Sequence, residues 1–121
     1  MNNNDPTAQA GYFYGERLEL GLRHAFRPEY VPLLMTYLGV EPGMSVLEAG
    51  CGTGFLARLI KRELPDTHVI GMDTDAGLLD YAKQLQLREG LQGKFDWHQG
   101  DAFHLPFADN QFDLATSQRL L

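Results

Sequence analysis

The chain has 121 residues, of which 44% are hydrophobic and 21% are charged, a balance typical of a protein that folds around its own core. Its formal charge of -6 repels polyanions, so we expect no nucleic-acid partner. The single cysteine, Cys51, excludes an internal disulfide, and every unbroken apolar run is too short for a membrane span. Because no secretory signal pattern is seen at the start either, we expect a cytoplasmic setting.

Residues 1–40 predict a flexible and helical segment ahead of the main domain. Residues 1–10 are small and polar, and we expect them to be frayed because they bury too little apolar area. Apolar residues at helical spacing predict one helix over residues 16–25, and Pro28 opens a second helix that runs to Leu38. The aromatic cluster around Tyr14 is a candidate lid over a ligand, although ordinary packing on the sheet is the alternative that we favour.

From residue 41 onwards the pattern changes to short strands that alternate with helices. Asp75 or Thr74 can cap one of these helices, and Gly90 follows it at the place where a left-handed residue is expected. The order predicts an α/β fold with a Rossmann-like, doubly wound, mostly parallel sheet of about four strands. The expected strands are 44–49, 68–73, 94–98 and 112–116, and the expected helices begin at Phe55 and directly after the Thr74 or Asp75 cap.

The stretch VLEAGCGTG, residues 46–54, is the first candidate site. Its apolar strand contains Glu48, and glycine then recurs at every second position. A glycine-rich turn between a strand and a helix presents free backbone N–H groups to a ligand, although a tight turn without a ligand is an alternative. Asp73 closes the next strand, where a carboxylate can accept both hydrogen bonds from a ribose diol. Together these features predict a nucleoside ligand.

The glycine spacing separates two kinds of nucleoside site. Dinucleotide sites usually show G-x-G-x-x-G, whereas this chain has E-x-G-x-G-x-G. An ionised Glu48 at the mouth of the loop would repel a pyrophosphate and would suit a positively charged ligand. An oxidoreductase that uses NAD therefore remains as the less favoured alternative.

Three segments in this order resemble the class I S-adenosylmethionine-dependent methyltransferases, in the branch of ubiquinone and menaquinone biosynthesis. They are VLEAGCGTG (residues 46–54), VIGMDTD (69–75) and GDAFHLPFADNQFD (100–113). The resemblance implies S-adenosyl-L-methionine as the cofactor. It also implies a cofactor-binding role for Glu48, Gly50, Cys51, Gly52 and Gly54 at the methionine moiety and for Asp73 at the ribose. Asp101 and Ala102 would read the adenine, Thr74 or Met72 would flank its face, and Tyr14 would contact the methionine carboxylate if the lid forms.

The same resemblance implies transfer of a methyl group to a small-molecule acceptor by in-line displacement. Such a reaction depends mainly on positioning, so no residue is named as catalytic. We expect residues 41–121 to be the N-terminal half of a longer methyltransferase domain, with self-association through an open sheet edge as a possible consequence. A non-catalytic module that binds S-adenosylmethionine is a further alternative.

A string of acids and histidines near the C-terminus raises the possibility of a metal site. Asp96, His98, Asp101 and His104 are closely spaced in the sequence. However, the resemblance already gives Asp101 a role, and the loop that follows it has no fixed geometry. We therefore expect no metal ion here.

Overall fold

Four parallel strands lie side by side in the order β3-β2-β1-β4 in the part of the chain that the computed structural model describes, residues 6–25, 27–93, 95–108 and 110–117. The parallel α/β sheet predicted from the sequence is confirmed. The strands are β1 (Ser45–Ala49), β2 (His68–Asp73), β3 (Phe95–Gln99) and β4 (Leu114–Ser117). The helices are α1 (Pro6–Ala25), the short 3-10 helix η1 (Pro28–Tyr30), α2 (Val31–Leu38), α3 (Phe55–Glu63) and α4 (Ala76–Arg88).

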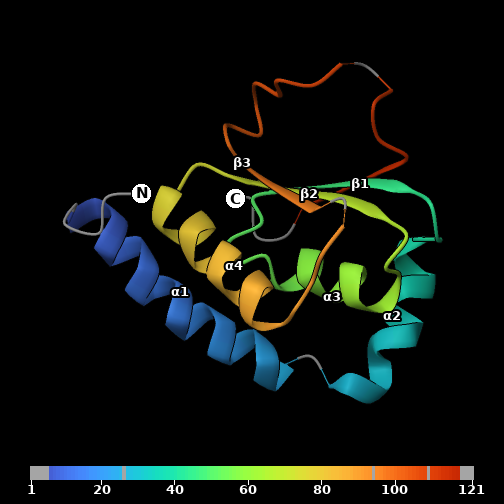
Figure 1. Cartoon of the computed structure of the whole chain (residues 1–121), viewed down its shortest axis with the longest axis horizontal. Coiled ribbons are helices and arrows are strands. Elements are labelled where there is room, and N and C mark those ends of the chain that lie inside the picture. The colour runs from blue at the N-terminus through green and yellow to red at the C-terminus, as the bar shows by residue number, and fades with distance from the viewer. Residues whose placement is uncertain (1–5, 26, 94, 109, 118–121) are drawn as a thin grey trace.

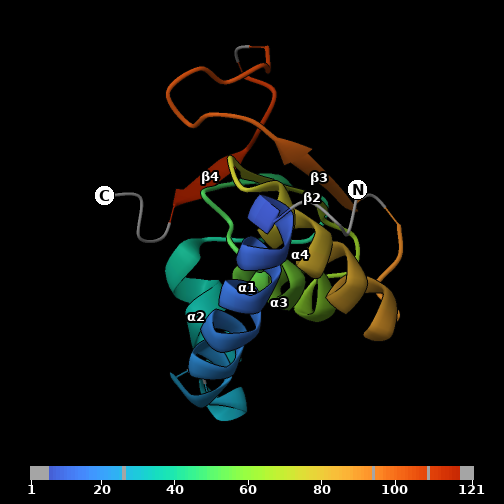
Figure 2. The ribbon, with the colours of Figure 1, turned by 90° about the vertical axis from the view of Figure 1, so that its left-hand side faces the viewer.

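The two faces of the sheet are covered by different kinds of structure. All four α-helices of the described residues lie on one face, and the segment of residues 100–108 and 110–113 passes over the other (Figures 1 and 2). On the second face, three buried side chains of the sheet, Leu47, Ile70 and Met72, pack against Ala102, Phe107 and Phe112 of that segment. Both faces are therefore covered, but only one of them carries regular helices among the described residues.

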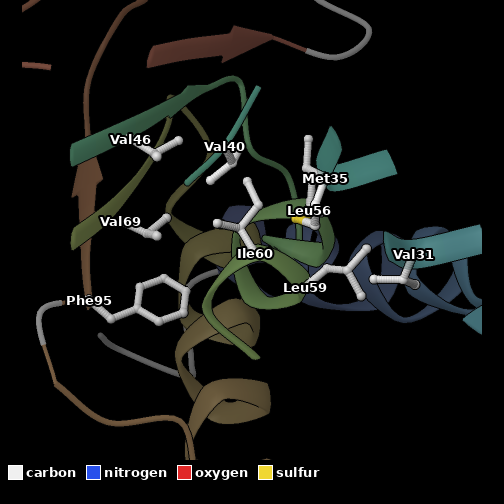
Figure 3. Close-up of a cluster of buried hydrophobic side chains, with 10 residues drawn as sticks. Val31, Met35, Val40, Val46, Leu56, Leu59, Ile60, Val69 and Phe95 are labelled. Atoms are coloured by element: carbon white, nitrogen blue, oxygen red, sulfur yellow. The ribbon is translucent and has the colours of Figure 1, made fainter. Parts of the chain in front are cut away.

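The register of the strands explains the core on the helical face. Val46 of β1 is paired with Val69 of β2, and Val69 is paired with Phe95 of β3. Because side chains alternate across a strand, these three point to the same face and form an apolar row. Ile60 of α3 packs on this row, and α2 contributes Met35 and Val31 to the same cluster (Figure 3). Burying each such side chain contributes roughly 1.5–3 kcal/mol, which holds the helices to the sheet.

The N-terminal helix begins earlier than the sequence predicted. We expected residues 1–10 to be frayed, and this is wrong for residues 6–10, which form the first turns of α1. Pro6 suits the first turn because its missing N–H has no helical partner there. Once a helix exists further along the chain, each added residue gains a hydrogen bond at little cost. Residues 1–5 lie outside the described part of the chain.

The helix α1 packs along α4, and its residues Glu19 and Leu22 are buried. Within the described ranges, none of the helices has the length and apolar character that crossing a membrane requires. β4 is bonded to β1, and its other edge faces no further strand among the described residues. Self-association through this edge stays a prediction.

Candidate functional site

The loop from Gly50 to Gly54 joins β1 to α3 with an unusual backbone. Gly50, Gly52 and Gly54 all have positive φ angles, of 69°, 57° and 73°. Residues with side chains adopt this conformation only at a cost, so the backbone itself requires glycine at alternate positions. Backbone hydrogen bonds hold the loop, among them those from Cys51 N to Met72 O (2.9 Å) and from Gly54 N to Cys51 O (2.8 Å). The backbone conformation therefore requires these three glycines whether or not a ligand binds.

Asp73 at the end of β2 connects this loop to the next one. Its Oδ2 accepts a hydrogen bond from Gly52 N, and its Oδ1 accepts one from Asp75 N, each at 2.9 Å. Each carboxylate oxygen still has a second lone pair. Asp73 is thus able to hold the glycine loop in place and to accept hydrogen bonds from a ligand at the same time.

A cavity of about 160 Å³ lies at the carboxyl ends of β1, β2 and β3. Two carboxylates, those of Asp73 and Asp101, belong to its walls, so the cavity suits a ligand rich in hydrogen-bond donors. The sequence analysis did not predict Gly100 and Phe103 as site residues. Their position beside the Asp101–Ala102 pair was the one feature that could have indicated them. The residues that line the cavity are Gly50, Asp73, Thr74, Gly100, Asp101, Ala102 and Phe103.

Asp101 is exposed and adopts a local turn with the residues that follow it. Its Oδ1 accepts a hydrogen bond from Phe103 N at 2.9 Å, and its Oδ2 lies 3.4 Å from His104 Nδ1. The bond from Phe103, followed by the one from His104, lowers the pKa of this carboxyl. Asp101 is therefore ionised at neutral pH and remains an acceptor.

Glu48 has a different environment from the one that its place in the motif suggested. Its side chain is buried, and its Oε2 accepts a hydrogen bond from Ala57 N of α3 at 2.8 Å. Burial raises its pKa to about 8, although the Ala57 N–H and the charge of Arg58 act in the opposite direction. Glu48 is not among the residues that line the cavity. The charge argument that we based on Glu48 is thus weakened, and its contact with a ligand stays a prediction.

The other predicted residues lie behind the cavity wall or outside the described side chains. Cys51, Gly52 and Gly54 are buried within the loop and do not line the cavity. Burial, followed by the nearby acids Glu48 and Asp73, raises the pKa of the Cys51 thiol. Tyr14 belongs to α1, but its side chain lies outside the described part, so the lid stays a prediction.

A buried ionic network behind the loop was missed by the sequence analysis. Thr53 of the glycine loop donates a hydrogen bond to Glu19 of α1 at 2.8 Å. Arg58 of α3 pairs with the same Glu19 carboxylate and also, at 2.6 Å, with Glu89 at the end of α4. Glu19 and Arg58 are 2% and 1% exposed. The network therefore joins α1, α3 and α4 to the candidate site. The paired residues lie 31 to 39 positions apart in the sequence, so no local pattern indicates their contact.

The acids and histidines of β3 and the following segment are arranged in separate pairs. Asp96 contacts His68 at 3.2 Å, whereas Asp101 contacts His104. Over the described ranges, no three His, Cys, Asp or Glu side chains gather in a way that could hold a metal ion.

A parallel sheet with a glycine-rich first loop, and with an acid from the second strand facing a cavity, is the arrangement of a Rossmann-like α/β domain. Comparison with known proteins narrows this class. Residues 46–121 match the model of the methyltransferase domain family, and the chain belongs to this family.

Individual relatives agree with this assignment. The ubiquinone/menaquinone biosynthesis C-methyltransferase of Legionella pneumophila is 36% identical over 100 residues, which are 82% of this chain and 38% of that protein. The sterol 24-C-methyltransferase of Gibberella zeae is 36% identical over 102 residues, 84% of this chain and 25% of that protein. The resemblance to class I methyltransferases noted in the sequence is confirmed.

A solved structure shows the same fold. It is a methyltransferase from Thiobacillus denitrificans in complex with S-adenosyl-L-homocysteine, 27% identical with a TM-score of 0.63, and the match covers 76% of this chain and 36% of that one. In all three comparisons the chain spans well under half the length of the protein that it matches.

Proposed function

We propose that this chain supplies the cofactor-binding part of an S-adenosylmethionine-dependent methyltransferase that acts on a small-molecule acceptor. The observation that carries the proposal is the cavity between Asp73 and Asp101 at the carboxyl ends of the strands. The family assignment and the quinone and sterol methyltransferases among the relatives support it. A cytoplasmic setting belongs to the same proposal, and the free, buried thiol of Cys51 is in keeping with a reducing compartment.

The residues of the cavity fit the cofactor in chemical type. The Asp73 carboxylate, with a free lone pair on each oxygen, would accept hydrogen bonds from the ribose hydroxyls. The ionised Asp101 would accept from the exocyclic amine of adenine, and the backbone N–H of Ala102 would donate to the ring. Gly50 presents only backbone to the cavity, so a ligand can approach it closely.

The sulfonium of S-adenosylmethionine supplies an activated methyl group. The residues of this chain would bind and orient the cofactor, and the rate would come mainly from bringing an acceptor into line with the methyl group. We propose an apolar acceptor, because Phe103 lines the cavity with 87% of its surface exposed, and Leu105, two residues further along the chain, is 48% exposed. Exposed apolar side chains next to a cavity favour a ligand with an apolar body.

Asp73→Asn provides the first test of this proposal. The substitution keeps the size of the side chain but replaces one acceptor oxygen with a donor, and we expect it to weaken binding of S-adenosyl-L-homocysteine at least tenfold. The measurement is calorimetric titration into the 121-residue chain, with folding checked by circular dichroism.

Asp75→Asn is the matched control. Asp75 caps α4 by accepting from Gly77 N and Leu78 N, and asparagine is an equally good cap. The affinity of the Asp75→Asn chain for S-adenosyl-L-homocysteine should stay within twofold of that of the original chain. Equal weakening in both variants would contradict the assigned role of Asp73, and tighter binding of NADH than of S-adenosyl-L-homocysteine would favour the oxidoreductase alternative. Lack of turnover on a panel of quinones and sterols by the protein that contains this chain would favour a non-catalytic module.

A further inference from the structure

Trp97 of β3 is the single tryptophan of the chain, and its indole ring lies directly against the glycine loop. A Cβ atom built on Gly54 would lie 2.2 Å from Cη2 and 2.4 Å from Cζ3 of this ring. Real Cβ atoms essentially never come within 3.0 Å of another heavy atom. Both the indole ring and the positive φ angle of Gly54 therefore require glycine at this position.

Gly71 of β2 meets the same ring from the neighbouring strand. It is paired with Trp97 in the register of β2 and β3, and its Cβ atom would lie 2.5 Å from Cζ3 and 2.6 Å from Cε3. Gly71 is not among the described glycines with a positive φ, so the backbone at this position would accept alanine. The indole ring, together with the Cys51 sulfur at 3.2 Å from the same Cβ position, is thus what requires glycine at residue 71.

The ring is held in place by its surroundings. The indole Nε1 donates a hydrogen bond to Gln86 Oε1 at 2.7 Å, and Gln86 Nε2 in turn donates to Leu91 O at 3.0 Å. The Phe95 ring lies against the indole with a centroid distance of 4.6 Å. The ring and its partner Gln86 are thus contacted by α4, by the turn after α4 and by β3. The ring therefore cannot move aside freely for a methyl group added at residue 71.

We propose that Trp97 is a positioning residue for the cofactor: its indole ring supports the glycine loop from behind and sets the place of Gly54, and through it of Gly52, relative to Asp73. The proposal rests on the proposed function, since the loop would bind the cofactor. Gly52 N bonds Asp73 Oδ2 two residues before Gly54, so a shift of the ring moves the loop against the carboxylate that would hold the ribose.

A mutant cycle between residues 71 and 97 tests this role. We expect Gly71→Ala to weaken binding of S-adenosyl-L-homocysteine at least tenfold, because the methyl group pushes the ring toward the loop. Trp97→Phe removes the atoms that the methyl group would meet, and by itself should weaken binding about threefold. The double variant should bind within about threefold of the original chain, since the smaller ring leaves room for the methyl group.

Gly21→Ala is the matched control, because no atom lies within 4 Å of its Cβ position and its φ is not positive. It should leave the affinity within twofold. A Gly71→Ala chain that binds like the control, or a double variant that binds no better than Gly71→Ala, would overturn the positioning role.

Hydrogen exchange of the Gly52 amide, without any ligand, separates this proposal from the proposed function. We expect Gly71→Ala to speed this exchange at least tenfold and Trp97→Phe to restore it in the double variant. If the original chain fails to bind S-adenosyl-L-homocysteine but this pattern holds, the proposed function fails and the support of the loop by Trp97 stands. If the original chain binds but the exchange pattern is absent, the positioning role is wrong.

Discussion

The two walls of the candidate cavity differ in how they are held. The wall formed by the glycine loop and Asp73 lies on the helical layer, where Thr53 bonds to Glu19 and Trp97 packs against Gly54. The wall formed by residues 101–103 belongs to the irregular segment on the other face, and Phe103 is 87% exposed. One wall is therefore shaped by packing before any ligand arrives, whereas the other has room to adapt to what binds.

The hydrogen bonds of the two walls show the same contrast. The loop wall is bonded to distant parts of the chain, as in the bond between Gly52 N and Asp73, 21 residues away. The segment is attached near its ends, by Gly100 N to Asp73 O at 3.0 Å and by Asp113 N to Ser45 O at 2.8 Å. Between these ends, the bonds of Asp101 are to residues two and three positions away. Precise placement of a ligand would therefore come from the loop wall.

Arg58→Met should have the largest effect, because it breaks the layer behind the loop wall. Removing this cation leaves the buried Glu19 carboxylate with the 54% exposed Arg23 as its ion-pair partner, and breaking a buried pair in this way costs up to about 3–5 kcal/mol. The free energy of unfolding, measured by urea denaturation, should fall by this amount. Arg62→Met removes an ion pair of a side chain that is 48% exposed, and should cost less than about 1 kcal/mol. Similar losses in both variants would contradict the contrast between buried and exposed pairs.

Glu48→Gln tests the buried carboxyl beneath the loop wall through its pH dependence. The folded pKa of about 8 exceeds the value of 4.5 for an unperturbed glutamate, so the fold favours the protonated form. The stability that Glu48 contributes is full below pH 4.5 and is lost as the pH rises to about 8. The amide resembles the protonated acid at every pH.

Relative to Glu48→Gln, the original chain should thus lose on the order of 3 kcal/mol between pH 5 and pH 8. Thermal unfolding at several pH values measures this difference. Glu63→Gln makes the same change at an exposed position of α3 and serves as the control. Parallel stability curves for Glu48→Gln and the original chain would show that Glu48 is ionised in the fold.

Phe107→Ala should lower the free energy of unfolding by less, because Phe107 belongs to the irregular segment on the second face of the sheet. The Phe107 ring packs on the second face of the sheet and contacts Phe112 edge to face, with centroids 5.1 Å apart. Because the ring is only partly buried, we expect a loss of about 1–2 kcal/mol in urea denaturation. Phe103→Ala in the same segment should change stability by less than about 0.5 kcal/mol. A loss as large as that of Arg58→Met would mean that both walls are equally rigid.

Local signals in the sequence predicted much of the fold. β2 has the predicted bounds, Asp75 is the cap of α4, and Gly90 has a φ of 67°. These features depend on neighbours in the chain, namely alternating apolar residues, capping side chains and turn glycines. The first turns of α1 were missed, because small polar residues gave no apolar pattern to follow.

The candidate site was predictable in its backbone but not in its support. Asp73, Asp101 and Ala102 line one cavity, as their place in the motifs indicated. The burial of Glu48 against Ala57 of α3 and the contact of Trp97 of β3 with Gly54 depend on how strands, loop and helix pack in three dimensions. Spacing along the chain carries no information about such contacts.

The burial of Cys51 makes the rate of its chemical labelling a measure of how often the loop opens. A thiol that is both enclosed and held in its protonated form does not react with an alkylating reagent, so labelling has to wait until the loop opens. Since this is the single cysteine in the chain, the rate of labelling would report the openings that expose this loop. If a nucleoside ligand closes over the loop, the same rate slows in its presence, and the degree of slowing reports how strongly the ligand favours the closed loop.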